Sequence, residues 1–195
     1  MINKFSKLLL LLLAIATTSL HAENTIGIDV NRADVEIVGN LDLNALVNYN
    51  DGTMYLLTFN YLHTAGEKTE SNNMTNVGFL AQSYFYGVEG LSLALGIEGV
   101  LASDFLAVPF VVKGTYDLPL IDIIPSTSFS LKVAFAPGVL SFRQAQNYLE
   151  FRTELDMEII SNLHLFTGYR NIDTKYETFD KTFNDSFYLG MKLKF

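Results

Sequence analysis

The sequence contains no cysteine and no tryptophan. Without cysteine the chain can form no disulfide, no thiol nucleophile and no cysteine-ligated metal site. A lipid anchor of the bacterial lipoprotein kind is excluded for the same reason. The fold must therefore be stabilised by burial and by backbone hydrogen bonds.

Basic residues are also scarce. The chain has 13 lysines and arginines against 21 acidic residues, which gives a formal net charge of −8. Proteins that bind nucleic acid need basic patches, so this composition argues against nucleic acid as a partner. Metal-ligand spacings and phosphate-binding glycine loops are absent too, and we therefore expect no cofactor.

The only long apolar run lies at the N-terminus. Lys4 and Lys7 precede the leucines of 8–13, and the small residue Ala22 comes before Glu23. This arrangement is typical of a secretory signal peptide, which we place at 1–22, and its removal would take the net charge to about −10. No later stretch approaches 18 apolar residues, so the sequence predicts no membrane helix. Residues 23–195 are expected to form one domain.

Alternation of apolar and polar residues runs through most of that domain. In 91–101, Leu93, Leu95 and Ile97 would face one way, and Ser92 and Glu98 the other. Similar segments of roughly 9–12 residues recur, which is the length of a tilted strand that crosses a bilayer. A soluble β-sandwich also alternates, but here the apolar faces carry no charge and the other faces combine glycine, alanine and serine with charges. The pattern predicts an all-β fold, a transmembrane antiparallel up-and-down β-barrel.

Ten strands are predicted, with eight as the alternative. Their expected ranges are 25–38, 41–50, 53–63, 74–86, 91–102, 105–117, 128–137, 147–159, 162–173 and 183–195. The apolar phase shifts between Val30 and Val35, which indicates either a bulge near 31–34 or two separate pieces. Segments 64–73, 138–146 and 174–182 are expected to be long outer loops.

The last strand alternates and ends in an aromatic residue. This pattern resembles the signal by which bacterial barrel proteins are recognised for assembly. We therefore expect the barrel-assembly machinery and periplasmic chaperones as partners during biogenesis. The signal residues would be Phe187, Leu189, Met191, Leu193 and Phe195.

Charged residues gather on the predicted inner face. The strand 147–159 carries five in succession, namely Glu150, Arg152, Glu154, Asp156 and Glu158. Unpaired charges in a narrow lumen would be costly, so partners are expected from other strands. The candidates are Glu98, Lys113, Lys132, His164, Arg170, Lys192 and Lys194. A turn at Ser161 would set Glu158 opposite His164 and bring Glu154 to Arg170. The set is interpreted as a salt-bridged filling of a small barrel, with an ion or proton path as the alternative.

Two other parts of the chain, the surroundings of His63 and the loop 138–146, contain candidate site residues. His63, at the expected outer rim, could pair with Ser71 or Ser141, but His164 lies near the periplasm and cannot share that site. This weak possibility is the basis for a lipid-modifying enzyme as an alternative, and no catalytic site is predicted. Val139, Leu140 and Phe142 place apolar side chains in an outer loop, where they would either fold over the rim or contact a partner or lipopolysaccharide.

Several motifs resemble those of the YfaZ family of outer-membrane proteins. They are APGVLSF at 136–142, Tyr148-Leu149-Glu150, Asn162 and Gly168-Tyr169-Arg170. Gly138 and the pair Gln144-Ala145 depart from acidic positions of that pattern, which puts any role of those acids in doubt. The resemblance implies an outer-membrane barrel and no established activity. We thus expect a monomeric, closed structural or interaction barrel surrounded by outer-membrane lipid and lipopolysaccharide, with a narrow pore and a lipid-modifying enzyme as alternatives.

Overall fold

The computed structural model describes residues 24–44, 52–64, 73–119, 126–176 and 180–195. The predicted signal peptide and Ser71 lie outside the described residues. Within the described residues, no helix has the length and apolar character needed to cross a membrane.

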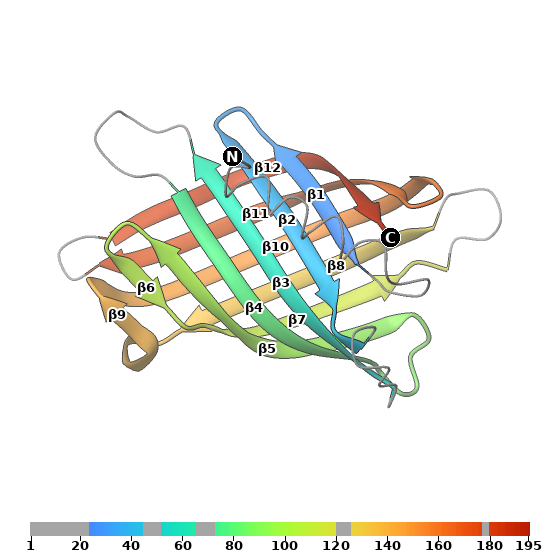
Figure 1. The fold of residues 1–195 in the computed structure, drawn as a ribbon, viewed down its shortest axis with the longest axis horizontal. Helices are drawn as coiled ribbons and strands as arrows, with labels where there is room; N and C mark the ends of the chain where they lie inside the picture. The colour runs from blue at the N-terminus through green and yellow to red at the C-terminus, as the bar shows by residue number, and fades with distance from the viewer. Residues whose placement is uncertain (1–23, 45–51, 65–72, 120–125, 177–179) are drawn as a thin grey trace, which may run out of the picture.

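Ten long antiparallel strands form a closed barrel (Figure 1). Each long strand pairs with the next long one along the chain, and the first closes against the last. They are β1 (Thr25–Val30), β2 (Asp34–Asp42), β3 (Thr53–Thr64), β4 (Asn73–Tyr84), β5 (Leu91–Ala102), β7 (Phe110–Asp117), β8 (Thr127–Ala136), β10 (Ala145–Ile160), β11 (Leu163–Tyr176) and β12 (Asp180–Lys194). The predicted all-β antiparallel barrel of ten strands is confirmed.

The expected first strand, 25–38, is in fact a hairpin of β1 and β2. The side-chain oxygen of Asn31 accepts hydrogen bonds from the backbone N–H groups of Ala33 and Asp34, both at 2.8 Å. Asparagine favours turns because its side chain can bond the backbone two residues on. The phase shift therefore marks a turn between two pieces, and the alternative of a bulge is wrong. The predicted strand 41–50 is also wrong at 43–44, because Leu41 and Asp42 are the last residues of β2, and 45–50 lie outside the described residues.

The two ends of the barrel are named here by the chain termini. At the terminal end, the N–H of Phe195 donates to the carbonyl of Asn24 at 2.9 Å. The opposite, distal end carries the connections 31–33, 103–104 and 137–144. The long outer loop expected at 174–182 is wrong, because Thr174 pairs with Lys181 and extends the antiparallel ladder. The polar residues of 174–182 suggest a loop, but polar residues can also lie in a strand when their backbone N–H and C=O groups are paired with a neighbouring strand.

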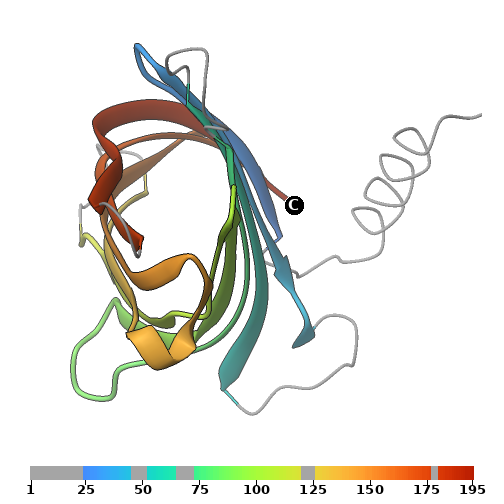
Figure 2. The ribbon, with the colours of Figure 1, turned by 90° about the vertical axis from the view of Figure 1, so that its left-hand side faces the viewer.

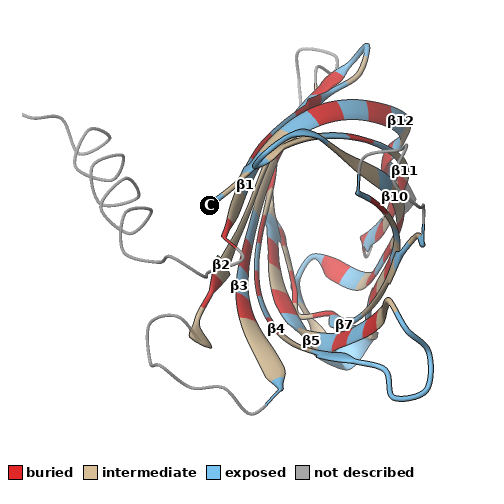
Figure 3. Ribbon diagram, turned by 90° about the vertical axis from the view of Figure 1, so that its right-hand side faces the viewer, coloured by how far each residue is buried: buried red, intermediate tan, exposed pale blue. Residues whose placement is uncertain are grey.

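Buried and exposed residues alternate along the strands of the wall (Figure 3), as expected where side chains point in turn into the lumen and to the outside. On β5, Leu93, Leu95 and Ile97 face outward and are exposed, whereas Ser92 and Glu98 are buried. The outward face thus presents large apolar groups to the surroundings all around the barrel. Water would not stabilise such a surface, since soluble monomers rarely expose large contiguous apolar patches.

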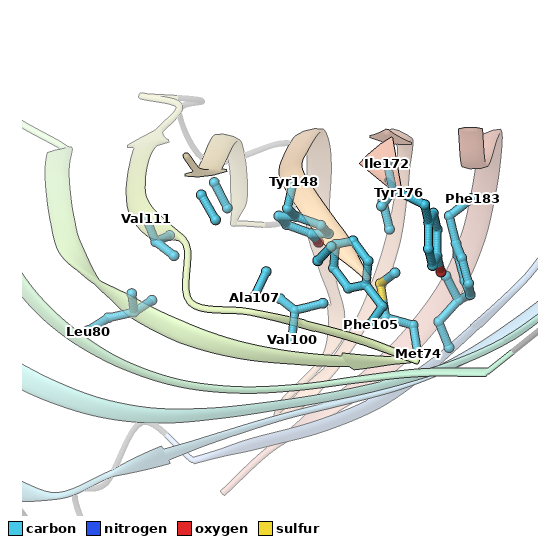
Figure 4. Close-up of a cluster of buried hydrophobic side chains, with 14 of the residues drawn as sticks. Met74, Leu80, Val100, Phe105, Ala107, Val111, Tyr148, Ile172, Tyr176 and Phe183 are labelled. Atoms are coloured by element: carbon cyan, nitrogen blue, oxygen red, sulfur yellow. The ribbon is translucent and has the colours of Figure 1, made fainter. Parts of the chain in front are cut away.

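A cluster of apolar and aromatic side chains fills the lumen near the distal end (Figure 4). The ring of Phe105 lies 5.3 Å from that of Tyr176 and 6.2 Å from that of Tyr148, measured between centroids. The cluster continues from there towards Leu80 and Val111. We call its distal part the distal plug, which comprises Leu62, Met74, Val100, Phe105, Tyr148, Ile172, Tyr176 and Phe183.

A strap of residues 137–144 holds the distal plug in place. It contains a short 3-10 helix, η1 (Gly138–Leu140), and the strand β9 (Ser141–Arg143), which pairs with β6 (Phe105–Ala107). The N–H of Val108 donates to the carbonyl of Leu140 at 2.9 Å. In the view of Figure 2 the orange segment around β9 lies within the ring of strands. The expected open loop 138–146 is therefore largely structured and packs across the distal end.

Glycine at position 96 allows close packing between β4 and β5. A Cβ atom there would overlap the carbonyl oxygen of Phe79 and lie 2.6 Å from Leu80 Cδ2, whereas at Gly114 the nearest neighbour, Leu93 Cδ2, would be 3.6 Å away. We expect Gly96→Ala to lower the free energy of unfolding by about 1–3 kcal/mol, since overpacking forces shifts of the backbone. Gly114→Ala is the matched control and should change it little. Urea unfolding in lipid vesicles measures both variants, and equal midpoints would contradict the expected clash.

Candidate functional site

The two acidic residues of the N-terminal hairpin face the lumen opposite each other. Asp29 and Glu36 are register partners on β1 and β2, and both are buried. Glu36 accepts hydrogen bonds from Nη1 and Nη2 of Arg152 at 2.8 and 2.9 Å, and a third from Nη1 of Arg170. One carboxylate of the hairpin thus binds two guanidinium groups that come from β10 and β11. Bidentate arginine–carboxylate pairs of this kind are strong and orientation-specific.

A chain of ion pairs continues from Arg152 to the other side of the lumen. Arg152 Nε donates to Glu150 Oε1 at 3.1 Å, and Lys132 Nζ lies 3.2 Å from Glu150 Oε2. Lys132 also lies 2.8 Å from Glu98 Oε1 on β5. We call this chain the lumen network, which comprises Asp29, Glu36, Glu98, Lys132, Glu150, Arg152 and Arg170. It joins β5, β8, β10, β11, β2 and β1 across the interior.

Four cations of the lumen lie on one register row across four neighbouring strands. Lys113 pairs with Lys132, Lys132 with Arg152, and Arg152 with Arg170. Like charges directly opposite each other on neighbouring strands are destabilising. The buried acids of the lumen network lie among these cations and offset that repulsion. Lys113, at the end of the row, forms no ion pair with any described residue.

Arg170 has the largest fully buried side chain of the lumen network. Its side chain is 0% exposed, and its Nε donates to the side-chain oxygen of Asn184 at 3.1 Å. Its guanidinium lies 5.3 Å from the centroid of the Tyr188 ring and 3.5 Å from Asp29 Oδ1. Its Nη2 atom has no hydrogen-bond partner among the described residues, so the nearby carboxylates of Glu36 and Asp29 must offset the cost of burying the charge.

The lumen network contacts the distal plug through Tyr148. The Tyr148 hydroxyl donates to Glu150 Oε2 at 2.9 Å, while its ring packs on Phe105. The apolar and the charged parts of the filling therefore share one side chain. A substitution at Tyr148 would disturb both.

A second group of charges, the terminal cluster, lies nearer the terminal end. Lys192 Nζ is 2.7 Å from Glu154 Oε1 and 2.7 Å from Asp156 Oδ2. His164 Nδ1 lies 2.6 Å from Asp156 Oδ1. The side chains of Lys192 and Glu154 are 18% and 17% exposed, against 0% for Glu150. The terminal cluster is therefore more exposed than the lumen network.

The structure brings most of the predicted lumen residues together but changes some pairs. Glu158 does lie opposite His164 in the register, yet His164 bonds Asp156, and Glu158 Oε1 accepts from the N–H of Asn162 at 3.2 Å. The expected pair of Glu154 with Arg170 is wrong, because Glu36 binds Arg170 and Lys192 binds Glu154. The backbone N–H of Lys194 donates to the carbonyl of Asn162 at 2.8 Å.

Three lumen residues were missed by the sequence analysis. The prediction of 25–38 as one strand obscures Asp29 and Glu36, whereas Asn184 lies in the predicted strand 183–195 but carries no charge to mark it as a lumen partner. Asp29 and Glu36 each stand between outward apolar residues in the sequence. Recognition of the Asn31 turn would have placed both of them in the lumen.

The other predicted site residues lie at the surface of the barrel. Val139 is 83% exposed and Phe142 46%, whereas Leu140 packs against the distal plug. The strap thus folds over the rim with one of its three apolar side chains, and contact of the others with a partner stays a prediction. The members of the predicted assembly signal all face outward on β12 or at its end, namely Phe187, Leu189, Met191, Leu193 and Phe195.

His63 and Ser141, one of the pairs expected at the outer rim, form no hydrogen bond with each other. At the distal rim, His63 Nδ1 lies 2.6 Å from the side-chain oxygen of Asn73. Ser141, one of its two expected partners, donates its hydroxyl to the carbonyl of Pro137 at 3.1 Å. No group of three or more potential metal ligands occurs in the part of the chain that the structure describes.

A family of known proteins matches the part of the chain that supplies most residues of the lumen network. Residues 110–195, which include β7–β12, match the family model described as YfaZ precursor. This part of the chain is YfaZ-like. The resemblance predicted from the motifs of 136–170 is thereby confirmed. The YfaZ-like part contributes Lys132, Glu150, Arg152 and Arg170 to the lumen network, and the acids Asp29, Glu36 and Glu98 come from the preceding strands.

Two solved structures are similar in outline. A structure of the KdgM porin shares 8% sequence identity and a TM-score of 0.43, with 88% of this chain and 98% of that chain covered. A structure of the NanC porin in a rhombohedral crystal form shares 9% identity and a TM-score of 0.41, with 90% and 100% covered. No curated protein matches the sequence.

Proposed function

We propose that this YfaZ-like chain is an outer-membrane β-barrel with a closed lumen, which acts as a structural or interaction barrel. Two features support this location. The outward face is apolar, and a closed barrel is one of the two structures that can cross hydrocarbon with all backbone hydrogen bonds made. In this proposal the terminal end faces the periplasm and the distal end faces the medium. Outer-membrane lipid and lipopolysaccharide would surround a monomer that assembly factors have inserted.

The observation that carries the closed lumen is the lumen network. Ion pairs link Glu98 on β5 through Lys132, Glu150 and Arg152 to Glu36 on β2, so charged side chains connect opposite walls. Small barrels have interiors that side chains fill. The distal plug closes the same lumen a second time, because its rings pack beneath the strap. Two successive closures leave the terminal half as a blind, water-accessible vestibule.

Single-channel recording in planar lipid bilayers tests the closure. The intact protein is expected to give no conductance steps, because an ion would have to cross both the apolar distal plug and the paired charges. Simultaneous replacement of Phe105, Tyr148 and Arg152 by alanine removes groups from both closures and should produce small steps. Insertion of both proteins is checked by the heat-dependent shift in gel mobility. Regular steps from the intact protein would contradict the closed lumen and favour the narrow pore.

A further inference from the structure

A hollow of about 500 Å³ lies on the outside of the barrel wall towards the distal end. It is formed between β8, β10, β11 and β12. Both strands that flank β11 are irregular here. The register shifts between Ala145 and Asn147 on β10, and again where β12 pairs with Ile172 and Asp173. Bulges re-aim side chains and are over-represented next to binding sites.

The hollow is apolar on one side and polar on the other. Phe135 and Leu149, which are 47% and 41% exposed, continue the outward apolar face of the barrel. The remaining lining comes from Asn147, Asp173, Thr174, Lys175 and Thr182. The hollow therefore spans the level at which the wall changes from apolar to polar. A membrane places the boundary between acyl chains and headgroups at such a level.

The polar side offers groups that suit sugar hydroxyls. Asp173 Oδ1 accepts a hydrogen bond from the Thr182 hydroxyl at 2.8 Å, which positions the carboxylate in the hollow. The side-chain amide of Asn147 forms no hydrogen bond with any described residue and can both donate and accept. Asp173 and Lys175 carry opposite charges, so the lining has no net charge to favour a free anion. Hydroxyl groups, which donate to carboxylates and pair with amides, fit this set.

From this combination we infer that the hollow binds the sugar headgroup of an outer-leaflet glycolipid. Its sugar would contact Asp173 and Asn147, and an acyl chain would lie along Phe135 and Leu149. The inference rests on the proposed function, because only a barrel whose distal end faces the medium would place the hollow in the outer leaflet. It assigns a specific lipid contact to one place on the wall.

The test uses the full mature chain in detergent micelles, and the probe is lipid A without its two phosphates, called lipid A below, because Asp173 would repel phosphate groups. Binding is followed by native mass spectrometry while lipid A is titrated. Asp173→Asn keeps an acceptor for Thr182 but removes the charge, and it should weaken binding about tenfold, because hydrogen bonds to charged groups are stronger than neutral ones. Asp104→Asn is the matched control, since it removes one exposed acid from a distal turn. This control should bind lipid A like the unchanged protein.

Two further measurements separate the possible outcomes. Asn147→Ala should also weaken binding, and phosphatidylethanolamine should not compete with lipid A for the site. Equal lipid A binding by Asp173→Asn, Asn147→Ala and the unchanged protein would overturn the inference, as would full competition by phosphatidylethanolamine. If the barrel instead stayed folded and soluble without detergent, the proposed function itself would fail. That result is independent of the comparison between variants.

Discussion

Replacement of Arg170 by methionine is expected to lower the free energy of unfolding by about 3–5 kcal/mol, which is typical for removing one partner of a buried ion pair. The methionine would fill much of the same volume beneath Tyr188. Arg170 is fully buried and lies against both Asp29 and Glu36. Its removal would therefore leave the negative charges of these two buried acids only partly neutralised. Glu36 would retain only Arg152.

Urea unfolding of the protein in lipid vesicles, followed by circular dichroism, measures this effect. Arg32→Met is the matched control, because Arg32 is exposed in the turn between β1 and β2. Exposed substitutions usually change stability by no more than about 0.5 kcal/mol. A double variant that adds Asp29→Asn removes one of the stranded negative charges and should recover part of the loss. Equal stabilities for Arg170→Met and Arg32→Met would show that the lumen network contributes nothing to the folded state.

The faces of the strands could be predicted from the sequence, because side chains on a strand alternate with a period of two. Glu150 and Arg152 on β10 were assigned to the lumen in this way, and Leu93 and Leu95 to the outside. The last strand was assigned equally well, because its apolar positions alternate as far as Phe195. Such assignments need only the local sequence.

Partners across the lumen could not be predicted in the same way. The expected pair of Glu154 with Arg170 considered only neighbouring strands, whereas Glu36 reaches Arg170 and Arg152 from the other side of the interior. Which side chains meet across a barrel depends on strand number, tilt and shear, and these are properties of the closed sheet. The hairpin at Asn31 is hard to predict for a separate reason. Apolar residues alternate on both sides of it and suggest one strand, while the only sign of a turn is the ability of the asparagine side chain to bond the backbone.

The hollow on the outer wall had no counterpart in the sequence analysis for a related reason. It depends on two bulges, and each bulge inserts one residue into an otherwise regular ladder. The sequence predicts Asp173 as the last residue of a strand and Lys175 in the loop that follows, where acidic and basic residues are ordinary. Their position beside Phe135 follows only from the pairing of β8, β10 and β11.

Among substitutions on the outer face of the wall, replacement of Leu95 by arginine is expected to lower the free energy of unfolding most. Leu95 lies near the middle of β5 and is 62% exposed, so nothing inside the protein packs tightly against it. If hydrocarbon surrounds it, Leu95→Arg should lower the free energy of unfolding in vesicles by about 2–4 kcal/mol. Leu193→Arg, near the terminal end of β12, should cost only about 0–1 kcal/mol, because the penalty decreases towards the interface.

This difference in depth separates a membrane barrel from a soluble one. Leu193 is 51% exposed, so both leucines have similar exposure and lose similar contacts within the protein. In water neither substitution would be costly, because arginine on an exposed face is well hydrated. Urea unfolding in vesicles compares the two variants directly. Two equally small effects would mean that no hydrocarbon surrounds β5, whereas a large effect at Leu95 alone can come only from the surrounding bilayer.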